Sequence, residues 1–498
     1  MADIVIGSGP AGLAAALARI ALGREVIVLD GGKTIDEHAD DGTEWSAVAR
    51  AEWMAPQFAA PAGQVRRYGS DFAMEPPEAT FAGGDALGLR SSRAVGGLSN
   101  LWGSAMLRWR QSDLVGWPIT ADDLAPSWRA LADHVPMSFQ PDALEALFPG
   151  PGSSGTALPA GPQVSWLLEA LERRPERLAA LRVTAGRSRV AVASGCRMCG
   201  LCMHGCPWGL IWTARRTIEA LARAGRITHR AGAVVRAVGE DGQGAVVHLA
   251  DGSVLRGERL FVAAGVLETA RILMTSEHGP TELMLRESQF AFLPMLHGWR
   301  SPRRPDQPPL HTLTQAFVEI DDPAISPFLV HAQLYGWNEF FPRDLKSNYG
   351  AKLPGSGPLL EWLARRLIVA QAFLHSDHCV GIRVRRASDG RLLPEVVGNP
   401  QTEAVMSRAL KQLSAAMRLG GVHALVPAAR LAEPGASFHV GASLPMRARP
   451  TAGESDPLGR PHGASRIHVV DASVLPAIPA TTITWGMMGN AHRIGLAA

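Results

Sequence analysis

The hydrophobic pattern of the first thirty residues predicts two short strands joined by a helix. Residues 3–6 and 24–29 are rich in isoleucine, valine and leucine, and residues 13–22 between them are rich in alanine and leucine. Short apolar runs are typical of buried strands, whereas a longer run of strong helix formers favours a helix. The turn after the first strand consists of Gly7, Ser8, Gly9, Pro10, Ala11 and Gly12. The second strand ends on Asp30.

This order of strand, glycine turn, helix, strand and acidic residue is the dinucleotide-binding fingerprint. In such a unit Gly7 makes the turn, Gly9 lets the backbone approach a pyrophosphate, and Gly12 lets the helix pack closely on the strand. The N–H groups and positive dipole at the helix N-terminus favour phosphate. Asp30 can accept hydrogen bonds from the ribose hydroxyls of adenosine. The first thirty residues therefore predict a bound dinucleotide rather than a merely structural turn.

A second strand-rich segment lies near the middle of the chain. Residues 231–265 predict strands separated by Asp-Gly turns at 241–242 and 251–252. The last of these strands enters Gly265, and residues 266–274 then continue as a predicted helix. Strands that alternate with helices in this way favour an α/β fold.

Four of the five cysteines lie in one short segment, 194–209. Cys196, Cys199, Cys202 and Cys206 have the spacing C-x2-C-x2-C-x3-C and are followed by Pro207. This is the spacing of a bacterial ferredoxin cluster loop, in which several thiolates bind one inorganic cluster. Structural zinc sites usually have two C-x2-C pairs separated by a long spacer, and disulfides require an oxidising compartment. The segment therefore predicts an iron–sulfur cluster and an electron-transfer function.

The ligand set of the predicted cluster has three alternatives. In two-cluster ferredoxins the fourth cysteine of such a run binds the other cluster, and this chain has a single run. Either Cys206 binds the same cluster, or the distant Cys379 supplies a ligand, or three cysteines hold a three-iron cluster. We expect all four cysteines of the segment to hold one four-iron cluster, because the segment already contains enough ligands.

Composition restricts the class of protein. With 498 residues, 46% of them hydrophobic, the chain can bury a large core and form two or more domains. The formal charge of +3 is small for this length, so it gives no argument for nucleic acid or a membrane surface as a partner. No apolar run reaches the length of a membrane span. Stretches rich in proline, at 149–162 and 300–309, predict surface loops.

We expect a cytoplasmic protein. The chain begins directly on a predicted strand, which leaves no room for a secretory signal. A reduced cysteine segment also suits the cytosol. Export in complex with a signal-bearing partner stays open, because it would leave no trace in this sequence.

Five further segments occur in the order seen in one enzyme family. They are residues 93–103 (RAVGGLSNLWG), 117–124 (WPITADDL), 261–273 (FVAAGVLETARIL), 439–446 (HVGASLPM) and 469–476 (VVDASVLP). Together with the N-terminal fingerprint they resemble the FAD signatures, the W-P-x-x-x-x-D-L segment and the H-x-x-G-[ST]-x-x-M motif of the glucose–methanol–choline oxidoreductases. The resemblance covers most of the chain.

The resemblance implies a two-domain α/β fold. A doubly wound, Rossmann-like FAD-binding domain is expected from residues 1–125, 185–284 and 431–498, including the cysteine segment. A substrate domain with an antiparallel sheet is expected from 285–430, and a helical or linker insertion from 126–184. The resemblance and the fingerprint together place FAD against Gly7, Gly9, Pro10, Ala11, Gly12, Asp30, Gly96, Gly97, Ser99, Asn100, Trp102, Val235, Gly265, Asp471, Thr482 and Ile483.

Within the family, the segment around Trp102 is similar to the branch that oxidises sugars. One member of that branch carries a histidine bonded to the flavin just before this tryptophan, and Leu101 occupies that position here. The resemblance therefore implies non-covalent FAD. The combination of these FAD signatures with a cysteine segment is similar to that in FAD-dependent glucose and glycoside dehydrogenases. In those enzymes the electrons leave the flavin through an iron–sulfur cluster.

The catalytic residue implied by the resemblance is His439, as the base that removes the hydroxyl proton, because the pKa of histidine lies near working pH. Two departures from the family occur here. Ala442 replaces the usual glycine, and Ile478 stands where a polar partner of the histidine is expected. Either Thr481 or Thr482 supplies the missing hydrogen bond, or His439 acts alone.

The leading hypothesis is an FAD- and iron–sulfur-dependent dehydrogenase that oxidises an alcohol group of a sugar, glycoside or aminosugar. Its partners would be that small molecule and an external electron acceptor, a protein or a cytochrome. Three alternatives stay open: a reductase that draws electrons from ferredoxin in the opposite direction, an electron-transfer adaptor without a substrate, and an oxidase whose cysteine segment is a structural clip.

Overall fold

The computed structural model describes most of the chain. The described residues are 1–34, 73–85, 87–150, 156–200, 202, 206, 208–277, 279–298, 310–338, 340–350, 352 and 355–498. Two of the predicted features fall largely outside these ranges, namely the loop at 300–309 and the glycine-rich residues 151–155. Pro207 of the cysteine segment also lies outside them.

A five-stranded parallel sheet joins both ends of the chain to its middle. Its order is β19 (Ile467–Val469), β8 (Leu260–Val262), β1 (Asp3–Ile6), β2 (Val26–Leu29) and β4 (Thr228–Arg230). All neighbouring pairs are parallel, and β1 in the centre pairs Ile4 with both Ile27 and Leu260. The predicted unit of strand, helix and strand is therefore confirmed. Its helix α1 (Pro10–Ala21) begins at Pro10 rather than at residue 13, since proline suits the first helical turn.

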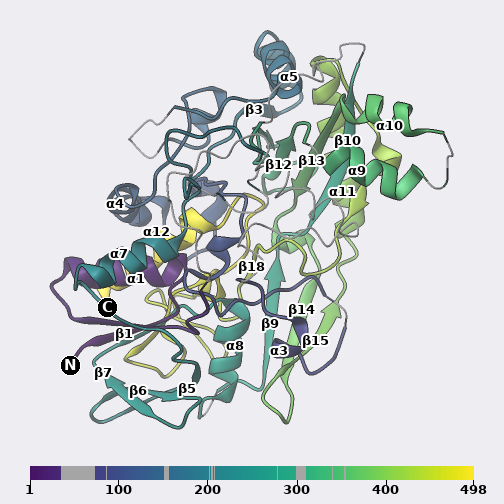
Figure 1. The fold of residues 1–498 in the computed structure, drawn as a ribbon. Coiled ribbons are helices and arrows are strands. Elements are labelled where there is room, and N and C mark those ends of the chain that lie inside the picture. Colours follow the sequence, from purple (N-terminus) through teal and green to yellow (C-terminus); the bar gives the residue numbers. More distant parts are fainter. Residues whose placement is uncertain are drawn as a thin grey trace.

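Two kinds of element cover the parallel sheet. The helices α1, α7 (Ala214–Arg223) and α12 (Thr484–Ala497) lie on one side, and the three-stranded antiparallel sheet β5–β7 lies on the other (Figure 1). The strands β5 (Val235–Asp241), β6 (Gly244–Leu249) and β7 (Val254–Gly257) are joined by turns at 242–243 and 250–253, which confirms the predicted strand-rich segment. Helix α8 (Val266–Thr275) follows β8, as expected.

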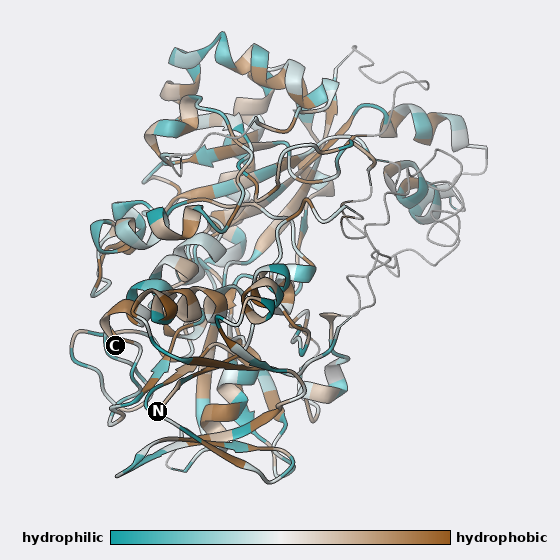
Figure 2. Cartoon of the chain, turned by 60° about the vertical axis from the view of Figure 1, so that its left-hand side comes forward, coloured by the Kyte–Doolittle hydropathy of each residue, from teal (hydrophilic) through white to brown (hydrophobic). Residues whose placement is uncertain are grey.

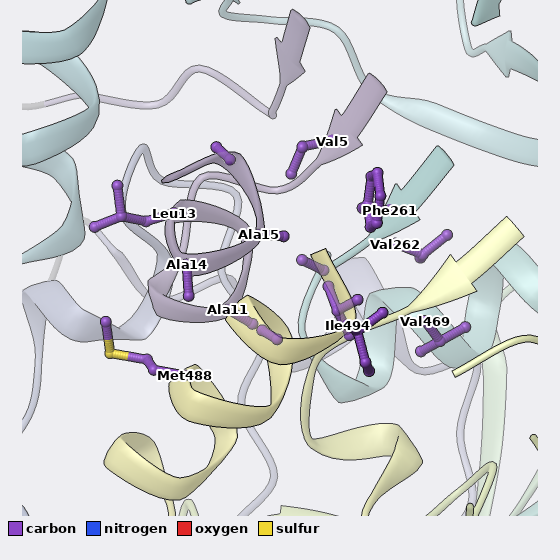
Figure 3. Close-up of a cluster of buried hydrophobic side chains, with 14 of the residues drawn as sticks. Val5, Ala11, Leu13, Ala14, Ala15, Phe261, Val262, Val469, Met488 and Ile494 are labelled. Atoms are coloured by element: carbon purple, nitrogen blue, oxygen red, sulfur yellow. The ribbon is translucent and has the colours of Figure 1, made fainter. Parts of the chain in front are cut away.

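The core between α1, α12 and the parallel sheet consists of small and branched apolar side chains. Val5, Leu13, Phe261, Val469 and Ile494 are all fully buried or nearly so (Figure 3). Alanine dominates the buried face of α1, so α12 can approach closely. A methyl group at Gly495 of α12 would lie 2.7 Å from the Cβ atom of Ala18. The apolar colouring of these elements is visible in Figure 2.

A second part of the molecule is built on antiparallel sheets. The larger has the order β16 (Val422–Ala424), β10 (Phe290–His297), β13 (Leu367–Phe373), β12 (Val330–Tyr335), β11 (Ala316–Ile320) and β3 (Val183–Arg187), with β17 (Arg430–Leu431) also paired to β10. The helix α11 (Thr402–Leu419) shares its core. A four-stranded sheet consists of β15 (Leu392–Val397), β14 (Gly381–Arg386), β9 (Glu282–Glu287) and β18 (Val440–Gly441).

The parallel and antiparallel sheets together form the predicted α/β fold. The proposed boundary at residue 185 falls inside β3, which pairs with β11 along its whole length, so residues 185–187 belong to the larger antiparallel sheet. The other α-helices of the described residues are α3 (Pro77–Thr80), α4 (Ala121–Ala132), α5 (Pro162–Glu172), α6 (Pro175–Ala180), α9 (Phe340–Leu345) and α10 (Gly357–Ala364).

The W-P-x-x-x-x-D-L segment has a structural role at the start of α4. Thr120 and Asp123 form a capping box, in which Thr120 Oγ1 accepts from Asp123 N at 3.3 Å and Asp123 Oδ2 accepts from Thr120 N at 2.8 Å. Trp117 packs edge-on against Trp109, with ring centroids 5.2 Å apart. The motif therefore begins a helix and anchors it to the core.

A buried ion pair ties the two ends of the chain together. Arg19 of α1 donates from Nε to Asp3 Oδ2 at 2.8 Å, and from Nη1 to the carbonyl oxygens of Gly495 and Ala498 at 2.8 and 2.9 Å. The side chains of Arg19 and Asp3 are 3% and 0% exposed, so water cannot replace either partner. Asp3 also accepts from Arg24, whose side chain is 33% exposed.

We predict that Arg19→Met lowers the free energy of unfolding by about 3–5 kcal/mol, because it removes the closer of the two arginine partners of a buried carboxylate and the arginine donor of two carbonyl groups. The matched control is Arg24→Met, which removes a half-exposed partner of the same Asp3 and should cost about 1 kcal/mol or less. Urea unfolding followed by circular dichroism measures both. Equal losses in the two variants would contradict the prediction.

Candidate active site

A large cavity lies between the parallel sheet and the larger antiparallel sheet. Its volume is about 1310 Å³, and residues that follow β1 and β2 line it together with residues of β10, β12 and β13. Pockets for single drug-sized ligands are about 300–1,000 Å³, so this cavity has room for a larger ligand or for two. Ligands of open parallel sheets bind beyond the carboxyl ends of the strands, where this cavity lies.

The glycines of the N-terminal turn have distinct surroundings. A methyl group at Gly12 would lie 1.8 Å from the Gly7 carbonyl oxygen, and one at Gly7 would lie 2.2 Å from the Ala263 carbonyl oxygen. At Gly9 the nearest protein atom would be 3.9 Å away, yet Gly9 lines the cavity. Packing thus requires Gly7 and Gly12, whereas the space beside Gly9 is left open for a ligand. Pro10 and Ala11, which begin α1, also line the cavity.

Asp30 lines the cavity at the end of β2, and both its carboxylate oxygens already have protein partners. Oδ1 accepts from Gly32 N at 2.7 Å, and Oδ2 lies 2.7 Å from Nε2 of His229 on β4. This contact raises the pKa of His229, while burial of the ring opposes the rise. His229 was not identified from the sequence, because nothing near it marks a site. The pair holds the carboxylate in one orientation, with lone pairs left for a ligand.

The second glycine segment forms a tight turn, η2 (Gly97–Asn100), that side chains hold in place. Ser99 donates to Gly96 O at 2.6 Å and accepts from Ala214 N, and Asn100 donates to Val95 O and Gly97 O. Gly97, Ser99 and Asn100 line the cavity, whereas Gly96 packs against Arg215 outside the cavity lining. Trp102 lines the cavity and donates from Nε1 to Trp212 O at 3.0 Å. Leu101 also lines it.

Asp471 joins three segments at the cavity wall. Its Oδ2 accepts from Gly265 N at 3.0 Å and from Thr269 Oγ1 at 2.6 Å, and its Oδ1 accepts from Ser473 N at 2.9 Å. Burial raises the pKa of Asp471, and these donors oppose the rise. Asp471 and Gly265 line the cavity, as does Val235. The carboxylate therefore fixes the start of α8 against the C-terminal segment.

His439 lines the same cavity from the antiparallel side. Its ring is stacked on Phe373 at 5.1 Å, and its Nδ1 is buried without a hydrogen-bond partner among the described residues. Burial lowers the pKa of His439 to about 4, so the imidazole is neutral at pH 7. Because Nδ1 is inaccessible, Nε2 is the ring nitrogen that a bound molecule can reach.

The backbone around His439 is held in an unusual conformation. Phe438 and Ala442 have φ values of 58° and 56°, which side chains other than glycine rarely adopt. This explains why a glycine is expected at position 442. Buried Glu287 accepts from Gly435 N at 2.8 Å, and Ser437 Oγ accepts from His439 N at 3.1 Å. The backbone that leads into His439 is therefore held by two hydrogen bonds.

The two candidate threonines differ in position. Thr482 lines the cavity and accepts from Leu107 N at 3.0 Å, whereas Thr481 is buried outside the cavity lining and its hydroxyl has no partner among the described residues. Ile478 is fully buried, and its backbone N–H and C=O both bond to Ser376. Ile483 lines the cavity at the start of α12, whose first N–H groups lack intrahelical partners.

The cavity wall on the antiparallel side contains polar residues that the sequence did not single out. Gln333 and Tyr335 of β12 and Gln371 of β13 all line it. The sequence did contain a signal for a polar wall. β12 has polar residues at every second position, namely His331, Gln333 and Tyr335, and alternate residues share one face of a strand.

The four clustered cysteines converge on one small space. Cys196, Cys199, Cys202 and Cys206 all border an apolar void of about 20 Å³, and the last two also line the large cavity. Gly200 has a φ of 74°, which allows the tight turn within the segment. Burial raises the pKa of Cys202 to about 12 and also that of Cys196, so these thiols are protonated without a metal. The cysteines therefore lie directly beside the large cavity.

The described residues contain no group of three or more His, Cys, Asp or Glu side chains in the arrangement of a metal site.

Cys379 lies elsewhere: it is buried in the core under the larger antiparallel sheet, where its Sγ accepts from Gln289 N at 3.2 Å. It borders neither the small void nor the cavity. His375 and His378, which precede it in the sequence, are also absent from the cavity wall.

No helix among the described residues is both long and apolar enough to span a bilayer.

One of three comparisons with known proteins supports the fold. A scan against protein-family models and a search of the curated proteins found no match. Among solved structures, the chain is similar to pyridoxine 4-oxidase from Mesorbium loti, with a TM-score of 0.63 and 15% sequence identity over 99% of this chain and 98% of that one. The likeness shows the fold, and the predicted fold class, with its parallel and antiparallel sheets in a two-domain arrangement, is confirmed.

We predict that Gly9→Ala folds normally but loses bound FAD, because its methyl group has room in the protein and would occupy the space beside the turn. Without the cofactor, its stability should change by about 1 kcal/mol or less. Affinity for FAD, measured by titration of the cofactor-free protein, should fall about tenfold or more. The matched control Gly12→Ala places its methyl group against a backbone oxygen and should destabilise the cofactor-free protein. Undiminished FAD affinity in Gly9→Ala would exclude the turn as the phosphate site.

Proposed function

We propose that this chain is an FAD-dependent oxidoreductase of the glucose–methanol–choline type that oxidises an alcohol group of a small molecule. The observation that carries the proposal is one continuous cavity lined both by residues of the dinucleotide fingerprint, Gly9 and Asp30, and by His439 of the predicted catalytic motif. The matched solved structure is named as an oxidase, which supports an oxidative reaction on this fold.

The residues of the cavity fit non-covalent FAD. Of the residues predicted to contact it, all except Gly12 and Gly96 line the cavity, and these two pack behind the turns. Arg90, Arg93 and Arg215 line it as well and favour a diphosphate. Leu101, in place of a flavin-linked histidine, offers no nucleophile. FAD, when bound, supplies the acceptor for the hydride of the alcohol carbon.

His439 takes the proton of the substrate hydroxyl on Nε2. Its neutral state at pH 7 suits this step, and its anchored backbone positions the ring. Thr482, at the cavity wall, is the threonine whose hydroxyl is available to the reaction site, since Thr481 lies outside it. The free N–H groups and the positive dipole at the start of α12 stabilise negative charge that develops nearby.

The cysteine segment supports a dehydrogenase with an iron–sulfur cluster. Cys196, Cys199, Cys202 and Cys206 would hold it, since their ferredoxin spacing brings four thiols around one void next to the cavity. That void has room for about one water molecule, so a cluster held there would need more space than the void offers. A cluster there would supply single-electron transfer to an external acceptor, a protein or a cytochrome. An oxidase would need no such group.

We predict that His439→Ala retains FAD but slows anaerobic flavin reduction by an alcohol substrate about a hundredfold or more, the usual contribution of positioned acid–base catalysis. Stopped-flow bleaching of the flavin measures the step. His375→Asn is the control, because His375 lies off the cavity and asparagine retains its capping acceptor. Equal bleaching rates in His439→Ala and the parent would remove His439 from the mechanism.

We predict that Cys199→Ser abolishes or converts the EPR signal of anaerobically prepared protein and stops reduction of an artificial dye, while substrate still bleaches the flavin. Cys379→Ser, the matched control, should retain both the signal and dye reduction because Cys379 borders neither space. Iron and sulfide analysis accompanies the spectra. A parent protein that contains zinc, or no iron, would assign the segment a structural role in an oxidase.

A further inference from the structure

Three neighbouring strands present one continuous face to the substrate side of the cavity. Their registers place Phe290, Phe373 and His331 in one row across β10, β13 and β12. The next row on the same face contains Phe292, Gln371 and Gln333, and the third contains Pro294, Val369 and Tyr335. Except for His331 and Pro294, all of these residues line the cavity.

The β10 side of this face is aromatic. Phe290 and Phe292 are T-shaped at 5.0 Å, and Phe290 lies 5.3 Å from Phe373, which in turn stacks on His439. Phe341 and Phe438 add two more rings to the cavity lining. A ligand ring that enters this part of the cavity meets aromatic side chains directly beside His439. Aromatic pairs contribute about 0.5–1.5 kcal/mol beyond the burial of area.

The β12 side of the face is polar but uncharged. Among the described residues between 290 and 440 that line the cavity, none is Asp, Glu, Lys or Arg; the arginines of the lining belong to the nucleotide side. The polar groups are Gln333, Gln371, Tyr335, Asn338, Thr312, Ser437 and His439. A charged substrate would therefore enter this half without a counter-ion among the described residues, at a high cost of desolvation.

A buried chain of hydrogen bonds fixes which polar atoms remain for a substrate. His331 Nδ1 donates to Glu319 Oε1 at 2.7 Å, and both side chains are fully buried. Gln333 Nε2 lies 3.2 Å from His331 Nε2 and is the donor, because an amide nitrogen can only donate. Tyr335 then donates to Gln333 Oε1 at 2.8 Å, and burial raises the pKa of Tyr335, so the phenol stays protonated.

The hydrogen-bond chain leaves the Nε2 group of Gln371 as a donor at the cavity wall. The amide oxygen of Gln333 is occupied by Tyr335, and Tyr335 is also 3.3 Å from the amide oxygen of Gln371. The Nε2 group of Gln371 has no acceptor among the described residues, although Gln371 lines the cavity. Its two N–H groups are therefore available to an acceptor atom on a bound molecule.

From these observations we infer that the substrate is an uncharged, flat aromatic alcohol whose ring carries a hydrogen-bond acceptor. The ring lies against Phe290 and Phe292, the ring acceptor binds Gln371 Nε2, and the hydroxymethyl group faces His439. The inference rests on the proposed function and narrows its substrate class. His331 and Glu319 are positioning residues, because they act only by orienting the amide of Gln333.

The proposed substrate class differs from the sugar that the segment around Trp102 suggested. A hexose carries hydroxyl groups around its whole ring, each of which needs a partner when buried, and an unpaired one costs about 1–3 kcal/mol. The polar groups on the β12 side could pair with some of these hydroxyl groups, whereas the phenylalanine rings on the β10 side offer no partner. The aromatic side of the wall therefore favours the aromatic alcohol.

The test is anaerobic flavin reduction by a panel of neutral alcohols: 3-(hydroxymethyl)pyridine, benzyl alcohol, cyclohexylmethanol, D-glucose and methyl β-D-glucoside. We expect benzyl alcohol to exceed cyclohexylmethanol, its non-aromatic counterpart, by about tenfold in kcat/KM. The pyridine should exceed benzyl alcohol by about another tenfold, and both sugars should be the slowest. Faster reduction by either sugar would overturn the inference but leave the proposed function intact. If no alcohol reduced a flavin that dithionite reduces, the proposed function itself would fail.

Two variants test which side chains recognise the substrate ring. Gln371→Leu should bring the ratio of kcat/KM for 3-(hydroxymethyl)pyridine over benzyl alcohol to about one, because it removes the donor and keeps the size of the side chain. Phe292→Leu should bring the ratio of benzyl alcohol over cyclohexylmethanol toward one. FAD content and thermal unfolding of each variant confirm an intact fold. A pyridine preference that survives Gln371→Leu would overturn the assigned donor.

Discussion

The molecule depends on the buried contact between Arg19 and the two ends of the chain. Arg19 on α1 binds Asp3 at the start of β1 and the last carbonyl groups of α12, 476 and 479 residues away in sequence. Because neither charge is exposed, the pair is stable only when all three elements are in place. This contact brings the C-terminal helix, whose first turn borders the cavity, onto the N-terminal nucleotide fold.

The cavity forms where the two ends of the chain are brought together. Once β19 and α12 lie beside β1 and β8, Asp471 can bond to Gly265 and Thr269, and the segments that carry the fingerprint and His439 face the same space. The cysteine segment completes the wall through Cys202 and Cys206. The residues proposed to hold the cofactor, the proposed base and the cysteine segment are thus adjacent, although they are distributed over most of the chain.

The larger antiparallel sheet makes one wall of the cavity aromatic on one side and polar on the other. Its face changes from aromatic on β10 to amide-bearing on β12, and the buried Glu319–His331 pair holds the amide of Gln333 in one orientation. A buried chain of hydrogen bonds resists rotation, because rotation of any member would leave a further group unpaired at a cost. Such a wall can distinguish ligands by the position of one acceptor atom.

The sequence by itself determined the features that depend on local spacing: the β1–α1–β2 unit, the β5–β7 turns, the α/β class and the clustering of four cysteines. Hydrophobic periodicity and glycine geometry act over a few residues, so the sequence displays them directly. Only the tertiary structure decided that Thr482 rather than Thr481 reaches the cavity, that β3 belongs to the antiparallel sheet, and that Gln333 and Gln371 share one wall. Strand register and burial make these choices, and both depend on contacts between segments that are distant in the sequence.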